Sequence, residues 1–114
     1  MLVNKFGLER IKLGSSELTN APILLAAAQT GHEVIFSSGM GTLDEIRTAL
    51  EVLAFGYLNS HAPKSRADFK GASESVAAKE ALLKNVTVLH CSTAYPTPFT
   101  DVNLKAMQTI SDEF

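Results

Sequence analysis

The chain has 114 residues, of which 46% are hydrophobic and 19% are charged, and its formal net charge is −2. This length and composition predict a single domain over residues 1–114 and exclude an intrinsically disordered chain. There is no basic field to hold a nucleic-acid backbone and no apolar run long enough to cross a bilayer, so we expect neither nucleic acid nor a membrane as a partner.

The cellular compartment is indicated by the cysteine content and the amino terminus. The chain holds one cysteine, Cys91, which cannot form an internal disulfide. Residues 1–12 lack the basic-then-apolar order of a secretory leader. We therefore expect a reducing, cytoplasmic location.

The first strand-and-helix unit covers roughly the first 30 residues. A short apolar strand is predicted at residues 11–13. Thr19 and Asn20 are both suitable N-caps for the helix that follows, and Pro22 suits its first turn. Gly31 is placed to end this helix in the left-handed conformation.

The second unit has a clearer strand and a capped helix. Residues 34–36 are apolar throughout, as expected for a parallel strand covered on both faces. Thr42 and Glu45 form a capping box, which predicts the start of a helix. At helical spacing, this helix carries a predicted buried stripe of Leu43, Ile46, Leu50, Leu53 and Tyr57.

The third unit follows a polar surface segment at residues 59–71. A short helix is predicted at 73–83, a strand at 86–89, and a last helix capped by Asp101. The apolar residues of that helix would be Leu104, Met107 and Ile110. The alternation predicts an α/β fold made of three consecutive β/α units with parallel strands.

Polar residues gather where each predicted strand ends, and in parallel α/β folds ligands bind beyond these carboxyl ends. Hydroxyl groups, a lysine and free backbone N–H groups suit a phosphate or carboxylate. Glu17 is the one anion of this set and suits proton transfer or a sugar hydroxyl. The candidates are Lys12, Ser15, Ser16 and Glu17, then Ser37 and Ser38, then Ser92, Thr93 and Tyr95.

Each candidate also has a purely structural interpretation. The hydroxyl residues could be helix caps, Lys12 a surface lysine and Glu17 a solvated loop residue. His90 follows an apolar strand and fits a hydrogen-bonded core histidine, and Cys91 fits a small buried residue. No pair of His, Cys or carboxylate residues has metal-ligand spacing, so we expect no metal site. From these patterns alone, the chain is an α/β unit that could bind a small anion.

The sequences of the turns, taken together, are more specific than any one of them. They read KLGSSE at 12–17, FSSGM at 36–40, LHCSTAYPTPF at 89–99 and DVNL at 101–104. This series resembles the sialic acid synthase (NeuB) family, and in particular its N-acetylneuraminate and legionaminate synthases. The family signatures have the same order and similar spacing, and the match covers nearly the whole chain.

The resemblance implies the fourth to sixth strands of a (β/α)8 barrel. It also implies a transferase that condenses phosphoenolpyruvate with an N-acylhexosamine of the N-acetylmannosamine type to give a nonulosonic acid and phosphate. A whole barrel needs about 250 residues. We therefore expect a truncated catalytic domain that is inactive alone, and the sequence leaves open whether this chain is itself an enzyme. The family's divalent metal, Mn or Mg, would be bound by residues absent here.

The resemblance also implies roles for individual residues. Glu17 would be catalytic, and Tyr95 would line the sugar side of the site. Thr93 stands where many members have Asn, and it lacks the amide donor. The residues that would bind phosphoenolpyruvate are Lys12, Ser15, Ser37 and Thr93.

Two other functions stay open at this stage. Part of a barrel leaves exposed sheet edges, which a second copy of the chain could close, so we expect a homo-oligomer. A non-catalytic assembly module of this kind is one alternative, and a small α/β module that only binds an anion is the other.

Overall fold

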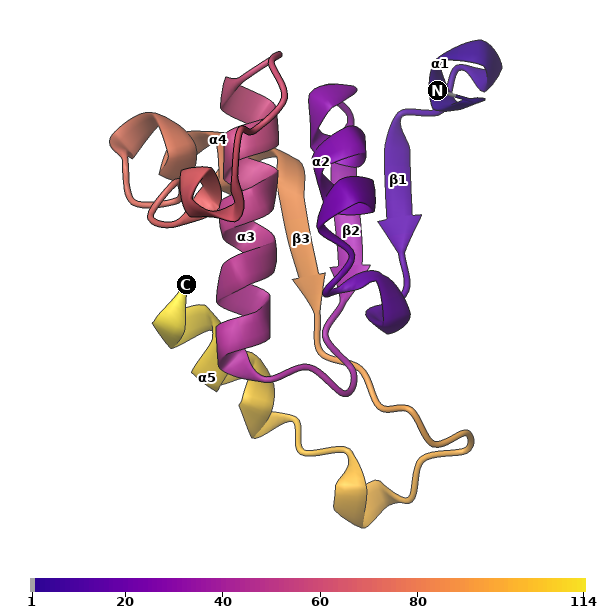
Figure 1. Ribbon diagram of the computed structural model, residues 1–114. Coiled ribbons are helices and arrows are strands. Elements are labelled where there is room, and N and C mark those ends of the chain that lie inside the picture. The colour runs from indigo at the N-terminus through magenta and orange to yellow at the C-terminus, as the bar shows by residue number, and fades with distance from the viewer. Residues whose placement is uncertain (1) are drawn as a thin grey trace.

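The structure, a computed structural model, describes residues 2–114. Its sheet has three parallel strands in the order β1-β2-β3, namely β1 (Arg10–Leu13), β2 (Glu33–Ser37) and β3 (Val86–Leu89). The helices are α1 (Leu2–Phe6), α2 (Ala21–Gln29), α3 (Leu43–Leu58), α4 (Val76–Asn85) and α5 (Lys105–Glu113) (Figure 1). The three predicted β/α units are confirmed.

The two faces of the sheet differ because residues alternate along each strand. In β1, Ile11 and Leu13 are buried, whereas Arg10 and Lys12 are exposed. Leu13 is paired in register with Phe36 of β2, which is completely buried. The apolar residues Ile11 and Leu13 face the helices, so Arg10 and Lys12 lie on the opposite face.

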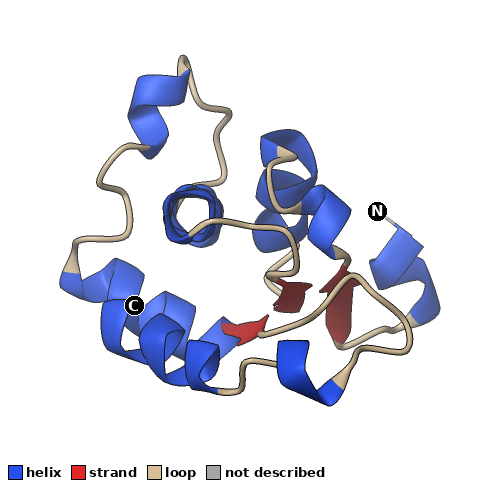
Figure 2. Ribbon diagram, turned by 90° about the horizontal axis from the view of Figure 1, so that it is seen from below, coloured by secondary structure: helices blue, strands red, loops and turns tan. Residues whose placement is uncertain are grey.

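Helices α2 and α3 lie side by side over one face of the sheet (Figures 1 and 2). They approach closely at Gly56 of α3, where an added Cβ would lie 2.7 Å from the Cβ of Ala28. The core between these helices and the sheet contains Leu24, Val34, Phe36, Val52 and Leu53, all less than 2% exposed.

The predicted helix boundaries hold for α2 and α3. Asn20, rather than Thr19, is the N-cap of α2, and Gly31 follows this helix with a φ of 76°. The Thr42–Glu45 capping box is confirmed at the start of α3. The predicted burial of Leu43 is wrong, because the first turn of α3 extends beyond the carboxyl ends of the strands and leaves Leu43 38% exposed (Figure 1).

Two other helix predictions need correction. α4 begins at Val76 instead of residue 73, and Ser75 caps it by accepting a hydrogen bond from the Ala78 backbone N–H. Asp101 does not cap the last helix, because it belongs to a separate 3-10 turn, η3 (Phe99–Asp101). Asn103 then adopts a φ of 45°, which separates this turn from α5.

The polar segment between α3 and α4 is fixed to the body of the protein. It contains a second 3-10 turn, η2 (Arg66–Phe69), whose Phe69 is 9% exposed and packs edge-on against Phe55. The backbone N–H of Gly71 donates to Oε1 of Glu51 at 2.9 Å. The segment is therefore a surface excursion with one buried anchor, which its mostly polar sequence did not indicate.

Tyr57 connects α3 to the amino ends of the strands. Its hydroxyl donates to the backbone carbonyl of His32 at 2.7 Å, just before β2. Burial, together with the nearby negative charge of Glu33, raises the pKa of Tyr57 to about 12. Among residues 2–114, no helix has the length and apolar character needed to span a membrane.

Candidate functional site

Lys12 and Ser37 meet at the carboxyl ends of two adjacent strands. The Lys12 ammonium donates to Oγ of Ser37 at 2.7 Å and to the backbone carbonyl of Leu13 at 2.9 Å. Ser37 is only 8% exposed, whereas Lys12 lies on the exposed side of β1. Lys12 is therefore an exposed lysine, as one interpretation expected, whose ammonium is held by two hydrogen bonds.

The geometry of this pair leaves hydrogen-bonding capacity for a ligand. A lysine ammonium has three donors, and a serine hydroxyl donates one proton while it accepts. Two donors of Lys12 are used, and Ser37 acts as an acceptor from it. One ammonium N–H and one hydroxyl proton therefore remain available to a ligand, and a bond from the ammonium to an anion would be charge-assisted.

The carboxylate of Glu17 is fixed by the cap of the next helix. Ser15 and Glu17 belong to a 3-10 turn, η1 (Ser15–Glu17), which follows β1 directly. Oε2 of Glu17 accepts a hydrogen bond from Nδ2 of Asn20 at 2.7 Å, while Oδ1 of Asn20 caps α2. Asn20 therefore orients Glu17 as well as starting a helix. The sequence predicted its capping role but not its contact with Glu17.

Thr93 and Tyr95 lie on the loop that follows β3. This loop extends from the carboxyl end of the strand to η3 (Figure 1). Thr93 is exposed, and Tyr95 is 86% exposed and precedes a cis peptide bond to Pro96. Both side chains therefore have free surface for a ligand.

All six predicted site residues lie at or beyond the carboxyl ends of the strands, as expected. Among the residues that the structure describes, Lys12 and Ser37 are the one pair of these six joined by a hydrogen bond. Within residues 2–114, no hydrogen bond or ion pair joins this pair to the other four predicted residues. Two of the six residues thus lie at the ends of β1 and β2 and are hydrogen-bonded, while the other four lie in the segments that follow β1 and β3.

His90 and Cys91 directly follow β3, and both were expected to have structural roles. Nε2 of His90 is 2.7 Å from the backbone carbonyl oxygen of Val102, so the expected hydrogen bond is present, but His90 is half-buried and does not belong to the core. Cys91 is half-buried. In the part of the chain that the structure describes, no group of three or more His, Cys, Asp or Glu side chains could hold a metal ion. The residues present do not fit a metal site.

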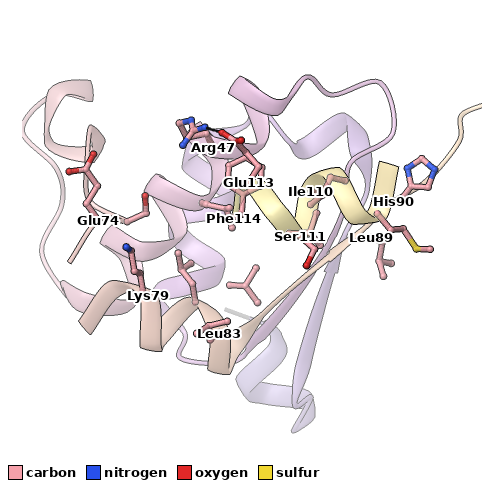
Figure 3. Close-up of a pocket in the computed structure, with 16 residues that line it drawn as sticks. Arg47, Glu74, Lys79, Leu83, Leu89, His90, Ile110, Ser111, Glu113 and Phe114 are labelled. Carbon is pink, nitrogen blue, oxygen red and sulfur yellow. Dashed lines mark hydrogen bonds and ion pairs between the residues drawn. The ribbon is translucent and has the colours of Figure 1, made fainter. Parts of the chain in front are cut away.

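One groove in the surface lies away from Lys12 and Ser37. A groove of about 830 Å³ is bounded by α3, α4, α5 and β3 (Figure 3). The ion pair between Arg47 and Glu113 crosses one side of it, and Arg47 also lies over the ring of Phe114. Neither Lys12 nor Ser37 lines this groove. Its lining combines aliphatic residues of α4 and β3 with charged residues of both signs, namely Arg47, Lys79, Glu74 and Glu113.

The NeuB family model matches residues 1–114. The chain belongs to the NeuB family. The resemblance inferred from the four turn sequences is therefore confirmed.

The chain is 38% identical over 113 residues to the N,N'-diacetyllegionaminic acid synthase of Campylobacter jejuni and covers 27% of that protein. It is 36% identical over 108 residues to the enzyme of the same name from Legionella pneumophila, of which it covers 24%. These alignments cover 99% and 95% of the chain. The NeuB-family chain thus spans about a quarter of the length of these relatives.

A solved structure supports the same fold. The N-acetylneuraminic acid (sialic acid) synthetase of Leptospira borgpetersenii, in complex with citrate, matches 99% of the chain with a TM-score of 0.69 and 28% identity. The match covers 30% of that structure. Three parallel β/α units that align with this share of a synthetase agree with part of a (β/α)8 barrel.

Proposed function

We propose that this chain supplies part of the phosphoenolpyruvate site of a nonulosonic acid synthase. The reaction would join C3 of phosphoenolpyruvate to the aldehyde carbon of an N-acylhexosamine of the N-acetylmannosamine type. Addition of water at C2 and departure of phosphate would complete it. Membership of the NeuB family and the names of the relatives support this proposal. The observation that carries it is the 2.7 Å contact between Lys12 and Ser37.

The pair suits phosphoenolpyruvate because this substrate carries a phosphate and a carboxylate close together. Lys12 would neutralise part of that charge, and Ser37 would donate to one of its oxygens. Ser15 and Thr93 offer further hydroxyl donors on the two flanking loops. These four residues are the proposed binding set, and the short strands hold the central two in place.

Glu17 and Tyr95 would serve the reacting sugar. The carboxylate of Glu17 is held by Asn20 at 2.7 Å and would move a proton at the reacting centre or position a sugar hydroxyl. The exposed ring of Tyr95 would line the sugar side. Polarisation of the aldehyde by a metal is not assigned to this chain, because the residues described do not fit a metal site.

Binding can be tested on the chain itself. Phosphoenolpyruvate should raise its melting temperature, and Lys12→Ala should lower the affinity about 10- to 100-fold, because a charge-assisted hydrogen bond contributes about 1.5–3 kcal/mol. Lys64→Ala is the matched control, since Lys64 is exposed on the segment after α3. Equal ligand-induced shifts in both variants, or no shift in the wild type, would count against the proposed site.

Turnover is a separate question, and we propose that the chain alone is inactive. Mixed with phosphoenolpyruvate, N-acetylmannosamine and Mn²⁺, it should release no phosphate above a protein-free control. Steady phosphate release that disappears in Glu17→Gln would refute this part of the proposal. We further propose a cytoplasmic location, which the single Cys91 supports.

A second candidate function is assembly with another copy of the chain. The strand order leaves β1 and β3 with one partner strand each, and unpaired strand edges favour association. We propose a homo-oligomer closed through these edges, either as a non-catalytic module or as the form that binds the anion. Light scattering that finds a monomer at all concentrations would exclude this candidate.

A further inference from the structure

Ser38 joins the loop after β2 to the end of β3. Its backbone N–H and its side-chain hydroxyl both donate to the carbonyl oxygen of Leu89, each at 2.9 Å. The backbone bond continues the parallel pairing one step beyond the last paired residues, Ser37 and Leu89. The hydroxyl bond is additional, because regular pairing does not require it. Ser38 is 8% exposed, so both bonds are shielded from water.

Gly39 allows the two loops to lie against each other. A Cβ at this position would be 3.3 Å from the carbonyl oxygen of Cys91 and 3.4 Å from Cγ2 of Thr93. The first of these neighbours is backbone and cannot rotate away. The absence of a side chain at Gly39 therefore brings residues 91–93 close to the loop that begins with Ser37.

The loop beyond this contact is held by its own hydrogen bonds. The backbone N–H of Ala94 donates to Oγ of Ser92 at 3.3 Å, and Oγ1 of Thr97 donates to the carbonyl of Ala94 at 2.6 Å. These two bonds restrict the loop, so its position depends on the residues with which it starts, at the end of β3. The close approach of Gly39 to Cys91 and Thr93 therefore helps to set where Thr93 lies.

We propose that Ser38 and Gly39 are positioning residues for ligand binding. By joining the loops after β2 and β3, they set Thr93 at a fixed place relative to Ser37, so that both hydroxyls can bind one phosphoenolpyruvate molecule. This inference rests on the proposed function, but the junction itself can be measured without any ligand. Ser38 is assigned through its two bonds to Leu89, and it need not touch the substrate.

Cys91 provides the measurement, because it is the single cysteine and lies half-buried inside the junction. Its labelling by an aromatic disulfide reagent under native conditions reports local opening of the loop. Ser38→Ala should raise the labelling rate about fivefold, the effect of losing one ordinary hydrogen bond. Ser38→Thr keeps the hydroxyl and should label at close to the wild-type rate. Ser60→Ala, at an exposed position after α3, is the control.

Phosphoenolpyruvate binding to the same variants is measured by titration calorimetry. Ser38→Ala should bind roughly twofold to tenfold more weakly, because ordering a looser loop costs binding free energy. Ser38→Thr should restore the affinity. Urea unfolding of each variant separates local opening from a loss of global stability.

The outcomes are distinct. Faster labelling and weaker binding in Ser38→Ala, with rescue of both by Ser38→Thr, would support the inference. Unchanged labelling, or faster labelling with unchanged affinity, would overturn it. If the wild type does not bind phosphoenolpyruvate, the proposed function fails and so does the ligand-binding part of the inference. The labelling rates would then still show whether Ser38 holds the loops after β2 and β3 together.

Discussion

Replacing Tyr57 with phenylalanine removes one hydroxyl that joins α3 to the amino end of β2. The hydroxyl donates to the carbonyl of His32 at 2.7 Å from a partly buried position. Its loss should lower the free energy of unfolding at pH 8 by about 1–2 kcal/mol, because a hydrogen bond is lost and its acceptor is left without this partner. The ring remains, so packing should change little.

The same variant gives a pH test. The pKa of Tyr57 rises from 10.0 to about 12 on folding. Between these values the unfolded chain has lost the phenolic proton while the native chain keeps it, so wild-type stability falls as pH rises and is fully present below pH 10. A two-unit shift corresponds to at most about 2.7 kcal/mol, and partial exposure reduces this to the order of 1 kcal/mol.

Urea unfolding of both proteins at pH 8 and pH 11 measures the effect. The stability advantage of the wild type over Tyr57→Phe should shrink by about 1 kcal/mol at pH 11. Other ionisable groups, including Tyr95, are present in both proteins and cancel in the comparison. An advantage that is equal or larger at pH 11 would refute the assignment of a protonated, hydrogen-bonded Tyr57.

Two further changes test packing and capping by urea unfolding. Leu53→Ala should cost about 2–5 kcal/mol, since Leu53 is completely buried in the core, and Leu83→Ala, at a residue 84% exposed, should cost less than about 0.5 kcal/mol. Similar losses in both would contradict the described core. Thr42→Ala should cost about 1 kcal/mol by removing the cap of α3, whereas Thr48→Ala within the same helix should be neutral or slightly stabilising. A neutral Thr42→Ala would argue against the capping box.

The parts of the fold that could be predicted are those determined by local chemistry. The capping box at Thr42, the left-handed Gly31 and the apolar strand at 34–36 each depend on a few neighbouring residues. Asp101 could not be placed correctly in this way. It has the chemistry of a cap, but the 3-10 turn ends at it and the left-handed Asn103 delays the helix.

In the candidate site too, the contacts that could be predicted are those that follow from the pairing of neighbouring strands. Parallel pairing places strand ends side by side, so a meeting of Lys12 and Ser37 could be expected from the pattern. The role of Ser38 could not, because its hydroxyl acts on a carbonyl 51 residues away in the sequence. The buried anchor at Phe69 was missed for a similar reason, since its partner Phe55 belongs to a different element.

Because side chains alternate along β1, the core and the candidate site both depend on the register of this strand. Ile11 and Leu13 face the helices, and Lys12 between them faces the opposite side of the sheet and contacts Ser37. Deleting one residue before Ile11, with the strand held at its amino end, would turn the Lys12 ammonium toward the apolar core and a leucine toward Ser37. The chain would then lose stability and the contact between Lys12 and Ser37 together. The register that buries Ile11 and Leu13 therefore also keeps Lys12 beside Ser37.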